Sequence, residues 1–250
     1  MPYLFVVSDV HGFYDEMMEA LENSGFDKYN PDHWLISCGD NWDRGTKPVE
    51  VTNFLDSLER KILIKGNHED LFIKCCERMF PEIHDYHNGT YNTILYFGRT
   101  TSSIPYEEKC KLALDKTKSF LSKQINYFET KNYIFVHGFI PVICENLSNG
   151  YQRYKKYEYD PNWRNASEKD WEKARWLNGV DVINKGVVPD KTVVCGHWHC
   201  SYGHSIDDGT SEFGSDANFS PYYRKNIIAL DACTAYSKKV NVVVLKDDFI

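Results

Sequence analysis

The sequence lacks any apolar run long enough to cross a membrane. Its amino-terminal apolar segment, residues 1–7, is far shorter than the ~20 residues that a transmembrane helix needs. The segment also lacks the basic residues that open a secretory signal. We therefore expect a cytoplasmic protein that has no membrane partner.

Positive charge and paired cysteines are also scarce. The chain has 29 Lys and Arg residues against 36 Asp and Glu residues, and this net charge of −7 argues against a nucleic-acid partner. The eight cysteines include no CxxC spacing, which favours buried thiols over disulfides or a thiolate zinc cluster. The sequence gives no indication of the oligomeric state.

Hydrophobic and aromatic residues, in contrast, are plentiful. They make up 42% and 15% of the chain, as expected for a globular protein. A length of 250 residues suffices for one large α/β core, and no internal repeat or linker divides the sequence. We expect a single domain that covers residues 1–250.

Three strand–loop–helix units are predicted in the amino-terminal part. Apolar runs predict strands at 3–7, 34–38 and 61–65, and apolar residues at helical spacing predict a helix after each. A polar cluster follows each strand directly. Ligands of parallel α/β sheets bind at the carboxyl ends of the strands, so these clusters are candidate site residues.

The remaining chain is less regular. We expect a helix at 106–123, a hairpin at 127–136, a short helix near 171–177 and strands at 192–195, 227–230 and 240–245. The polar segments 80–105, 145–165 and 203–221 are expected to be loops. The last could close over the site. The Lys- and Tyr-rich run 151–157 is predicted to be a solvated face, with substrate contact as the alternative.

The strand ends supply a set of metal-ligand side chains. This set contains Asp9, His11, Asp40, Asn67, His68, His137, His197 and His199. Carboxylate, amide and imidazole ligands suit Mn²⁺, Fe²⁺ or Zn²⁺, and no cysteine is needed. A carboxylate such as Asp40 has two oxygens, which can bridge two ions about 3.5–4 Å apart, the separation used for two-metal hydrolysis.

The order of these residues resembles a known family. The segments SDVHG (8–12), GDNWDRG (39–45), GNHE (66–69), VHG (136–138) and GH (196–197) are similar to the motifs of calcineurin-like metallophosphoesterases. Within that superfamily they most resemble the serine/threonine phosphoprotein phosphatase branch, including its short bacterial and phage members. The resemblance implies an α/β fold in which a two-sheet sandwich is flanked by helices.

The resemblance also implies a metal-binding role for each ligand. The first ion would be held by Asp9, His11 and Asp40. The second ion would be held by Asp40, Asn67, His137 and His197. We expect Mn²⁺ in both places, with Fe²⁺ or Zn²⁺ as alternatives.

Further residues would act on the substrate. His68 would protonate the leaving oxygen and Asp43 would orient its ring, because a carboxylate beside an imidazole favours the protonated form. Arg44 would bind phosphate oxygens in a bidentate manner, and Asn67 would also lie against the phosphate. Arg175 is the candidate for a second phosphate-binding arginine, although its local match to the family is weak.

The sequence departs from the family pattern at several positions. Ser8 stands where this branch usually has glycine, and Lys65 stands where arginine is usual. In GHWH (196–199), the second histidine, His199, is expected to be an extra ligand of the first ion, and an ordinary loop histidine is the alternative. Trp42 and Trp198 flank ligands and could stack on a substrate, although packing in the wall is the favoured role.

The implied activity is metal-dependent hydrolysis of a phosphate monoester, through direct attack by a bridging hydroxide without a phosphoenzyme. A phosphoserine or phosphothreonine protein is the leading substrate class. The alternatives are a small-molecule phosphatase and a symmetrical diadenosine-tetraphosphate hydrolase. A metal-bearing binding module without turnover is a remote alternative, because Asp43, Arg44 and His68 are all present.

Overall fold

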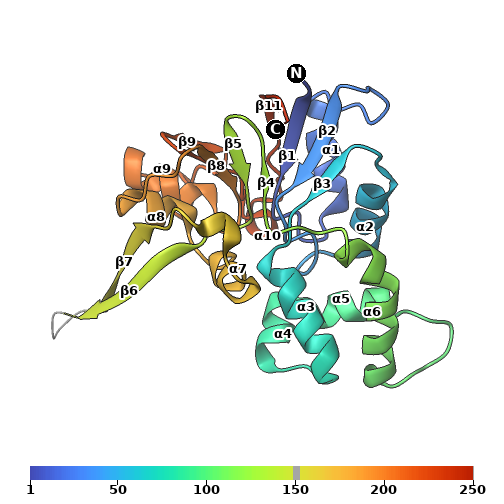
Figure 1. The fold of residues 1–250 in the computed structure, drawn as a ribbon. Coiled ribbons are helices and arrows are strands. Elements are labelled where there is room, and N and C mark those ends of the chain that lie inside the picture. Colours follow the sequence, from blue (N-terminus) through green and yellow to red (C-terminus); the bar gives the residue numbers. More distant parts are fainter. Residues whose placement is uncertain (149–152, 250) are drawn as a thin grey trace.

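The computed structural model describes residues 1–148 and 153–249. A four-stranded and a five-stranded sheet pack face to face, and helices lie on the outer side of each (Figure 1). The α/β sandwich expected from the sequence is therefore confirmed.

The first sheet has the strand order β11-β1-β2-β3. Its strands are β1 (Tyr3–Val7), β2 (His33–Ser37), β3 (Lys61–Leu63) and β11 (Val243–Lys246). The first three are parallel, and β11 joins β1 in the antiparallel direction. The helices that follow the parallel strands are α1 (Tyr14–Asn23), α2 (Pro48–Ser57) and α3 (Asn67–Arg78). This arrangement confirms the three predicted strand–loop–helix units.

The second sheet has the strand order β4-β5-β8-β10-β9. Its strands are β4 (Phe128–Glu129), β5 (Tyr133–Phe135), β8 (Thr192–Cys195), β9 (Tyr222–Arg224) and β10 (Ile227–Ala229). The central three strands are parallel, and the two edge strands are antiparallel to them. The outer face is covered by α7 (Glu168–Ala174), α8 (Gly179–Asn184) and α9 (Cys200–Asp208). The parallel strands of the two sheets thus end near one another.

Alternation along each strand divides the core into three layers. On β1, Leu4 and Val6 face the second sheet, whereas Phe5 packs against the helices of the first. On β8, Val194 faces inward and Val193 packs against the outer helices. Successive strand side chains point to opposite faces, so each buried strand contributes to two layers. This two-sided burial explains why the strands are apolar at nearly every position.

The segment 80–105, expected to be a loop, contains α4 (Ile83–Asn88) and α5 (Thr90–Phe97), which precede α6 (Tyr106–Leu121). Its Asn, Thr and Tyr residues are weak helix formers, so tertiary contacts decide the outcome. Asp85 is buried, accepts a hydrogen bond from the Glu82 N–H and pairs with Arg78. Between the two helices, Gly89 has a φ of +88° and lies against the backbone of Arg44, where a Cβ would not fit.

Two other expected loops are also partly regular. The segment 145–165 contributes to an antiparallel hairpin of β6 (Val142–Ser148) and β7 (Arg153–Tyr159), which projects from the body of the molecule (Figure 1). It is followed by the 3₁₀ turn η1 (Trp163–Asn165). In the segment 203–221, helix α9 continues to Asp208, and its Gly203 packs directly on the Tyr222 ring. A short helix, α10 (Thr234–Ser237), was not predicted.

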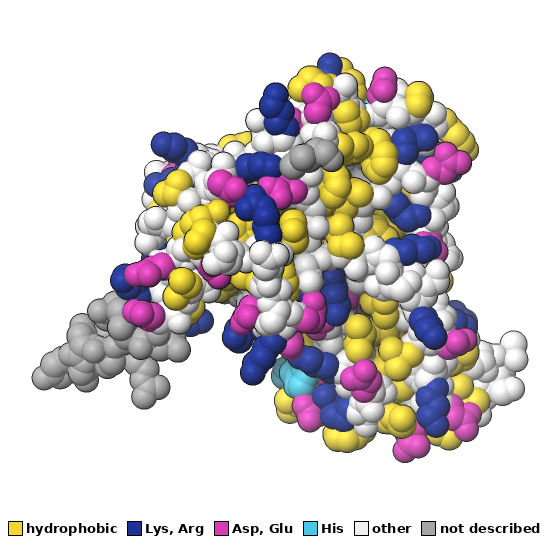
Figure 2. Space-filling view, viewed as in Figure 1, with side chains coloured by type: hydrophobic (Ala, Val, Ile, Leu, Met, Phe, Trp, Pro, Cys, Tyr) yellow, Lys and Arg dark blue, Asp and Glu magenta, His cyan; other side chains and the backbone are white. Residues whose placement is uncertain are grey.

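The surface and the thiols agree with the composition. Figure 2 shows basic and acidic side chains interspersed over one face of the molecule. Within the described ranges, no helix has the length and apolar character needed to cross a membrane. In the same part of the chain all eight cysteines are free thiols, and six of them are buried. Cys144 is exposed, whereas Cys233 is half-buried.

We expect the layer between the sheets to contribute strongly to stability. Phe135 on β5 is fully buried in this layer, and Phe135→Ala should lower the free energy of unfolding by about 3–5 kcal/mol because a cavity remains. Urea unfolding measures the change. Tyr29→Ala, at a side chain that is 79% exposed, is the control. Similar losses in both variants would contradict this assignment of the core.

Candidate active site and metal centre

The predicted ligands lie on loops that follow strands of both sheets. Asp9 and His11 follow β1, and Asp40 follows β2. Asn67 begins α3 just after β3. From the second sheet, His137 follows β5 and His197 follows β8. The site therefore exists only where the two sheets meet.

These loops place several ligands in unusual backbone conformations. Asp9, His11, Asp40 and His197 have positive φ angles of 52°, 51°, 55° and 65°. Residues other than glycine rarely adopt such angles, and each costs on the order of 1–3 kcal/mol. Beside them, a Cβ on Gly196 would overlap the side chains of Ser8 and Asp9. The surrounding fold therefore holds these loops in a strained arrangement that aims the side chains at one another.

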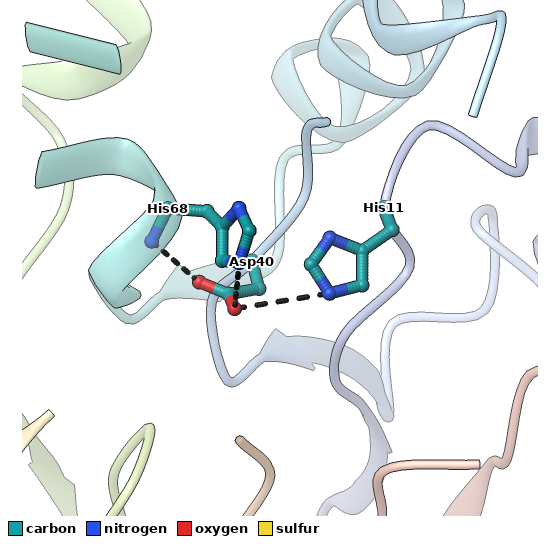
Figure 3. Close-up of side chains that lie close together, drawn as sticks. All are labelled: His11, Asp40 and His68. Carbon is teal, nitrogen blue, oxygen red and sulfur yellow. Dashed lines mark hydrogen bonds and ion pairs between the residues drawn. The ribbon is translucent and has the colours of Figure 1, made fainter. Parts of the chain in front are cut away.

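The Asp40 carboxylate lies at the centre of this arrangement. One candidate metal group consists of His11, Asp40 and His68, and a second consists of Asp40, His137 and His197. Figure 3 shows the carboxylate between the rings of His11 and His68. Its Oδ2 atom is 3.8 Å from Nε2 of each ring. Asp40 thus belongs to both groups, as expected for a bridging ligand.

Two further predicted ligands, Asp9 and Asn67, lie next to these two groups. Asp9 Oδ1 lies 3.9 Å from His11 Nε2. On the other side, His137 Nε2 lies 3.4 Å from Asp40 Oδ1. The Asn67 Oδ1 atom lies 2.7 Å from His137 Nε2 and 2.9 Å from His197 Nδ1. The structure therefore brings together all six side chains that the resemblance implied as core ligands.

The outer nitrogens of two histidines are fixed by backbone carbonyls. His11 Nδ1–H donates to Trp42 O, and His137 Nδ1–H donates to Cys38 O, both at 2.8 Å. These bonds leave each Nε2 atom facing the carboxylates. Metal-binding histidines commonly have such an oriented second nitrogen, so the donor set fits divalent ions with imidazole and carboxylate ligands.

The pKa values of the histidines in the site are consistent with binding of a cation. Burial and the nearby Arg44 lower the pKa of His11, and burial beside His137 lowers the pKa of His197 to about 3. Both rings are neutral and offer lone pairs. Burial opposes protonation of His137, but Asp40 and Asp9 outweigh it and raise its pKa to about 10. His137 thus carries the proton that a bound cation would displace.

Asp43 and His68 form a buried pair. His68 Nδ1–H donates to Asp43 Oδ2 at 2.7 Å, and Asp43 is completely inaccessible to solvent. The hydroxyls of Thr90 and Thr93 on α5 also donate to the Asp43 carboxylate, each at 2.7 Å. Sequence reasoning missed both threonines because it left their segment without a helix. The available signal was the spacing of the two threonines at i and i+3, which would place them on one face of a helix.

Glu69 is a second residue that the sequence reasoning left without a role. Its buried carboxylate accepts hydrogen bonds from the backbone N–H groups of Asp40, Asn41 and Gly66. These bonds join the turn after β2 to the start of α3. Glu69 therefore holds the Asp40 carboxylate in place without contacting it.

The arginines occupy different environments. Arg44 is exposed, and its Nη2 atom lies 3.5 Å from His68 Nε2. Arg175, in contrast, is 3% exposed, and its guanidinium donates to Asp70, Asn126 and Glu168 at 2.7–2.8 Å. The structure therefore does not place Arg175 as a free phosphate ligand. Its weak match to the family gave no sign of this network.

His199 and the two tryptophans also differ in their surroundings. His199 Nε2 pairs with Glu212 and is in neither candidate metal group of the described residues, so its role as an extra ligand stays a prediction. Trp42 is completely buried in the wall of the site, as favoured. Trp198 is 38% exposed and stacks on His199.

The Glu69→Gln substitution tests the support of the Asp40 turn. An amide group cannot accept all of these backbone N–H bonds, so we expect a loss of about 1–3 kcal/mol of stability. Metal affinity should fall about 10–100-fold as the turn loosens. Urea unfolding and Mn²⁺ titration calorimetry measure these effects. Glu22→Gln, at an exposed position, is the matched control. Wild-type metal affinity in Glu69→Gln would contradict the positioning role.

Comparisons with known proteins agree with this geometry. Among curated relatives, the asymmetrical bis(5'-nucleosyl)-tetraphosphatase PrpE of Bacillus subtilis is 29% identical over 134 residues, which cover 50% of this chain and 49% of that protein. A symmetrical bis(5'-nucleosyl)-tetraphosphatase of Coxiella burnetii is 26% identical over 137 residues, or 55% and 42% of the two chains. This chain spans half or less of the length of these curated relatives.

Solved structures share the fold. A cold-active protein-tyrosine phosphatase from a Shewanella species has a TM-score of 0.52 and 16% identity, covering 98% of this chain and 76% of that chain. A structure provisionally assigned as a diadenosine tetraphosphatase has a TM-score of 0.51 at 16% identity, with 98% and 91% coverage. A family model described as calcineurin-like phosphoesterase matches residues 3–201. The chain therefore belongs to the calcineurin-like phosphoesterase family of metal-dependent hydrolases.

Proposed function

We propose that this chain hydrolyses a phosphoester or phosphoanhydride bond of a nucleotide with the help of two divalent metal ions, which the residues around Asp40 would hold. The observation that carries this proposal is the position of Asp40 between two groups of ligands. Asp9 and His11 would complete the site of the first ion, and Asn67, His137 and His197 that of the second. Bound ions would supply Lewis acidity to the phosphoryl group and a nucleophile at neutral pH.

His68 is positioned to act as the general acid. Its Nδ1–H bonds to Asp43, so Nε2 faces the reacting groups beside Asp40. Burial disfavours the charged ring, but Asp40 and the hydrogen bond to Asp43 outweigh this effect and raise the pKa of His68. When the oxygen of a water that has already lost a proton to solvent forms its bond to phosphorus, the bond from phosphorus to the leaving oxygen breaks. The Nε2 proton then passes to that oxygen.

Arg44 is the candidate that holds the phosphate. Its side chain is exposed and lies beside His68, on the same loop as Asp43. A guanidinium in this place can bind two non-bridging phosphate oxygens and stabilise the charge of the transition state. Asn67, whose side-chain oxygen faces His137 and His197, would place its amide NH₂ near the same oxygens.

The substrate is inferred from the relatives. Curated proteins that match about half of the chain are named as bis(5'-nucleosyl)-tetraphosphatases, which favours a dinucleoside polyphosphate. A phosphoserine or phosphothreonine protein is the second candidate. It is favoured by the GDNWDRG and GNHE segments and by the exposed position of Arg44, which a protein segment could reach.

A substrate comparison tests the proposed function. With Mn²⁺, the protein should hydrolyse a dinucleoside tetraphosphate with a higher kcat/KM than a phosphoserine peptide, and chelation should abolish both activities. Chromatography of the products distinguishes cleavage into two diphosphates from cleavage into a mono- and a triphosphate. A preference for the phosphopeptide would favour the second candidate. A protein that binds two ions but hydrolyses neither substrate would be a binding module.

Leaving-group dependence tests the role of His68. In His68→Ala, kcat should fall by about 10²–10⁴ on alkyl phosphates, whose leaving oxygen needs a proton, and much less on p-nitrophenyl phosphate. Steady-state assays across a series of leaving groups measure the slope. His87→Ala, at an exposed histidine of α4, is the control and should leave the slope unchanged. Equal losses for good and poor leaving groups would exclude a general-acid role.

A further inference from the structure

A pocket lies between the β6–β7 hairpin and α7, next to the candidate active site. It has a volume of about 750 Å³. The hairpin contributes Cys144 and Lys155, α7 contributes Asp170 and Lys173, and Trp176 lies in the segment that follows α7. Figure 1 shows α7 beside the base of this hairpin. The volume is within the range of about 300–1,000 Å³ that is typical of small-molecule sites.

Trp176 lies between this pocket and the second candidate metal group. Its indole ring is half exposed and packs edge-on against the ring of His197, with centroids 5.7 Å apart. The end of α7, just before Trp176, contacts the loop that carries His137, where the Phe139 N–H donates to Ala174 O at 3.1 Å. A ligand that fills the pocket therefore reaches the edge of the second candidate metal group.

The hydrogen bonds of Arg175 hold the segment that carries Trp176. Asp70 on α3, Asn126 before β4 and Glu168 on α7 bind the three nitrogens of the guanidinium. Because Arg175 directly precedes Trp176, its buried side chain fixes the backbone that presents the indole. The arginine that the sequence suggested as a phosphate ligand instead supports a neighbouring binding surface.

The chemistry of the lining favours a nucleoside over a second phosphate group. Two lysines are balanced by Asp160 and Asp170, and Lys173 pairs with Asp170 at 2.9 Å. The pocket thus offers no excess of positive charge to a polyphosphate. An exposed indole can stack on a planar base, and carboxylates can accept hydrogen bonds from ribose hydroxyls and from amino groups of a base. Val142 and Leu177 supply an apolar floor.

We propose that the pocket between the β6–β7 hairpin and α7 binds one nucleoside of the substrate, with its base stacked on Trp176. This inference rests on the proposed function, since it requires a nucleotide whose reacting phosphate lies at the Asp40 cluster. Lys155 would lie beside the phosphate chain as the chain leaves the pocket, and Asp160 would bind the ribose. A phosphorylated protein segment in the same pocket is the competing outcome of the test.

Cys144 provides a readout that is independent of turnover. Among the eight cysteines it is the exposed one, and it lines this pocket. A methylene-bridged dinucleoside tetraphosphate, added to the Mn²⁺-loaded protein, should slow its modification by a thiol reagent at least about fivefold. Inorganic phosphate should not slow it. Peptide mass spectrometry assigns the modified cysteine, and Cys144→Ser supplies the background.

The outcomes separate the two proposals. If the bridged dinucleotide inhibits hydrolysis of p-nitrophenyl phosphate completely but leaves Cys144 labelling unchanged, the pocket is wrong and the proposed function stands. If Cys144 is protected but dinucleotides are not hydrolysed, the pocket binds a nucleoside that belongs to no substrate, and both the substrate proposal and the substrate role of the pocket are overturned. Protection by a phosphoserine peptide but not by the dinucleotide would overturn the nucleoside assignment.

Trp176→Ala measures the contribution of the indole. Base stacking on an aromatic side chain predicts a rise in KM for the dinucleotide on the order of 10–100-fold, with KM for p-nitrophenyl phosphate unchanged. Trp176→Phe should recover part of the affinity. Trp198→Ala is the matched control, because Trp198 is also exposed beside His197 but does not line the pocket. Equal KM changes for both substrates in Trp176→Ala would show that the indole only supports His197, and would overturn the proposal.

Discussion

The buried Asp40 carboxylate imposes the constraint on which the rest of the site depends. It is 2% exposed and faces His11, His68 and His137, while the His68 backbone N–H donates to it at 2.9 Å. Burial opposes its ionisation, but His137 and His68 hold its pKa well below the usual range. A buried charge needs compensation at close range, so the loops of both sheets must supply partners or a cation there.

Several separate parts of the structure fix the Asp40 carboxylate and the side chains around it. Glu69 fixes the turn that carries Asp40, and the positive φ angles of the ligand loops aim their side chains at the carboxylate. The helices α4 and α5 lie further out, where Thr90 and Thr93 orient Asp43 and, through it, His68. The apolar layer between the sheets holds the two halves of the cluster at a fixed distance. Phosphoryl chemistry needs such fixed positions, since its catalysis depends mainly on orientation and charge.

The sequence predicted much of the fold because strong local patterns agreed with the tertiary structure. The apolar runs before Asp9, Asp40 and His197 are strands, and polar residues follow each of them. Prediction failed where local propensity was weak. Helix α5 is rich in Asn, Thr and Tyr, and contacts with a distant segment hold it through Thr90 and Thr93. The hydrogen-bond network of Arg175 could not be foreseen for a related reason, since its partners lie up to 105 positions away, and its phosphate-binding role stays a prediction.

By itself, the sequence determined the types of the candidate ligands, their order and their places at strand ends, because residue chemistry and apolar periodicity are local properties. It also determined the pairing of Asp43 with His68 in principle, through the family motifs. Only the tertiary structure decided which atoms face Asp40, which hydroxyls support Asp43, and that the buried Arg175 guanidinium donates to Asp70. Those outcomes depend on distances between residues far apart in the chain, and the packing of two sheets sets these distances.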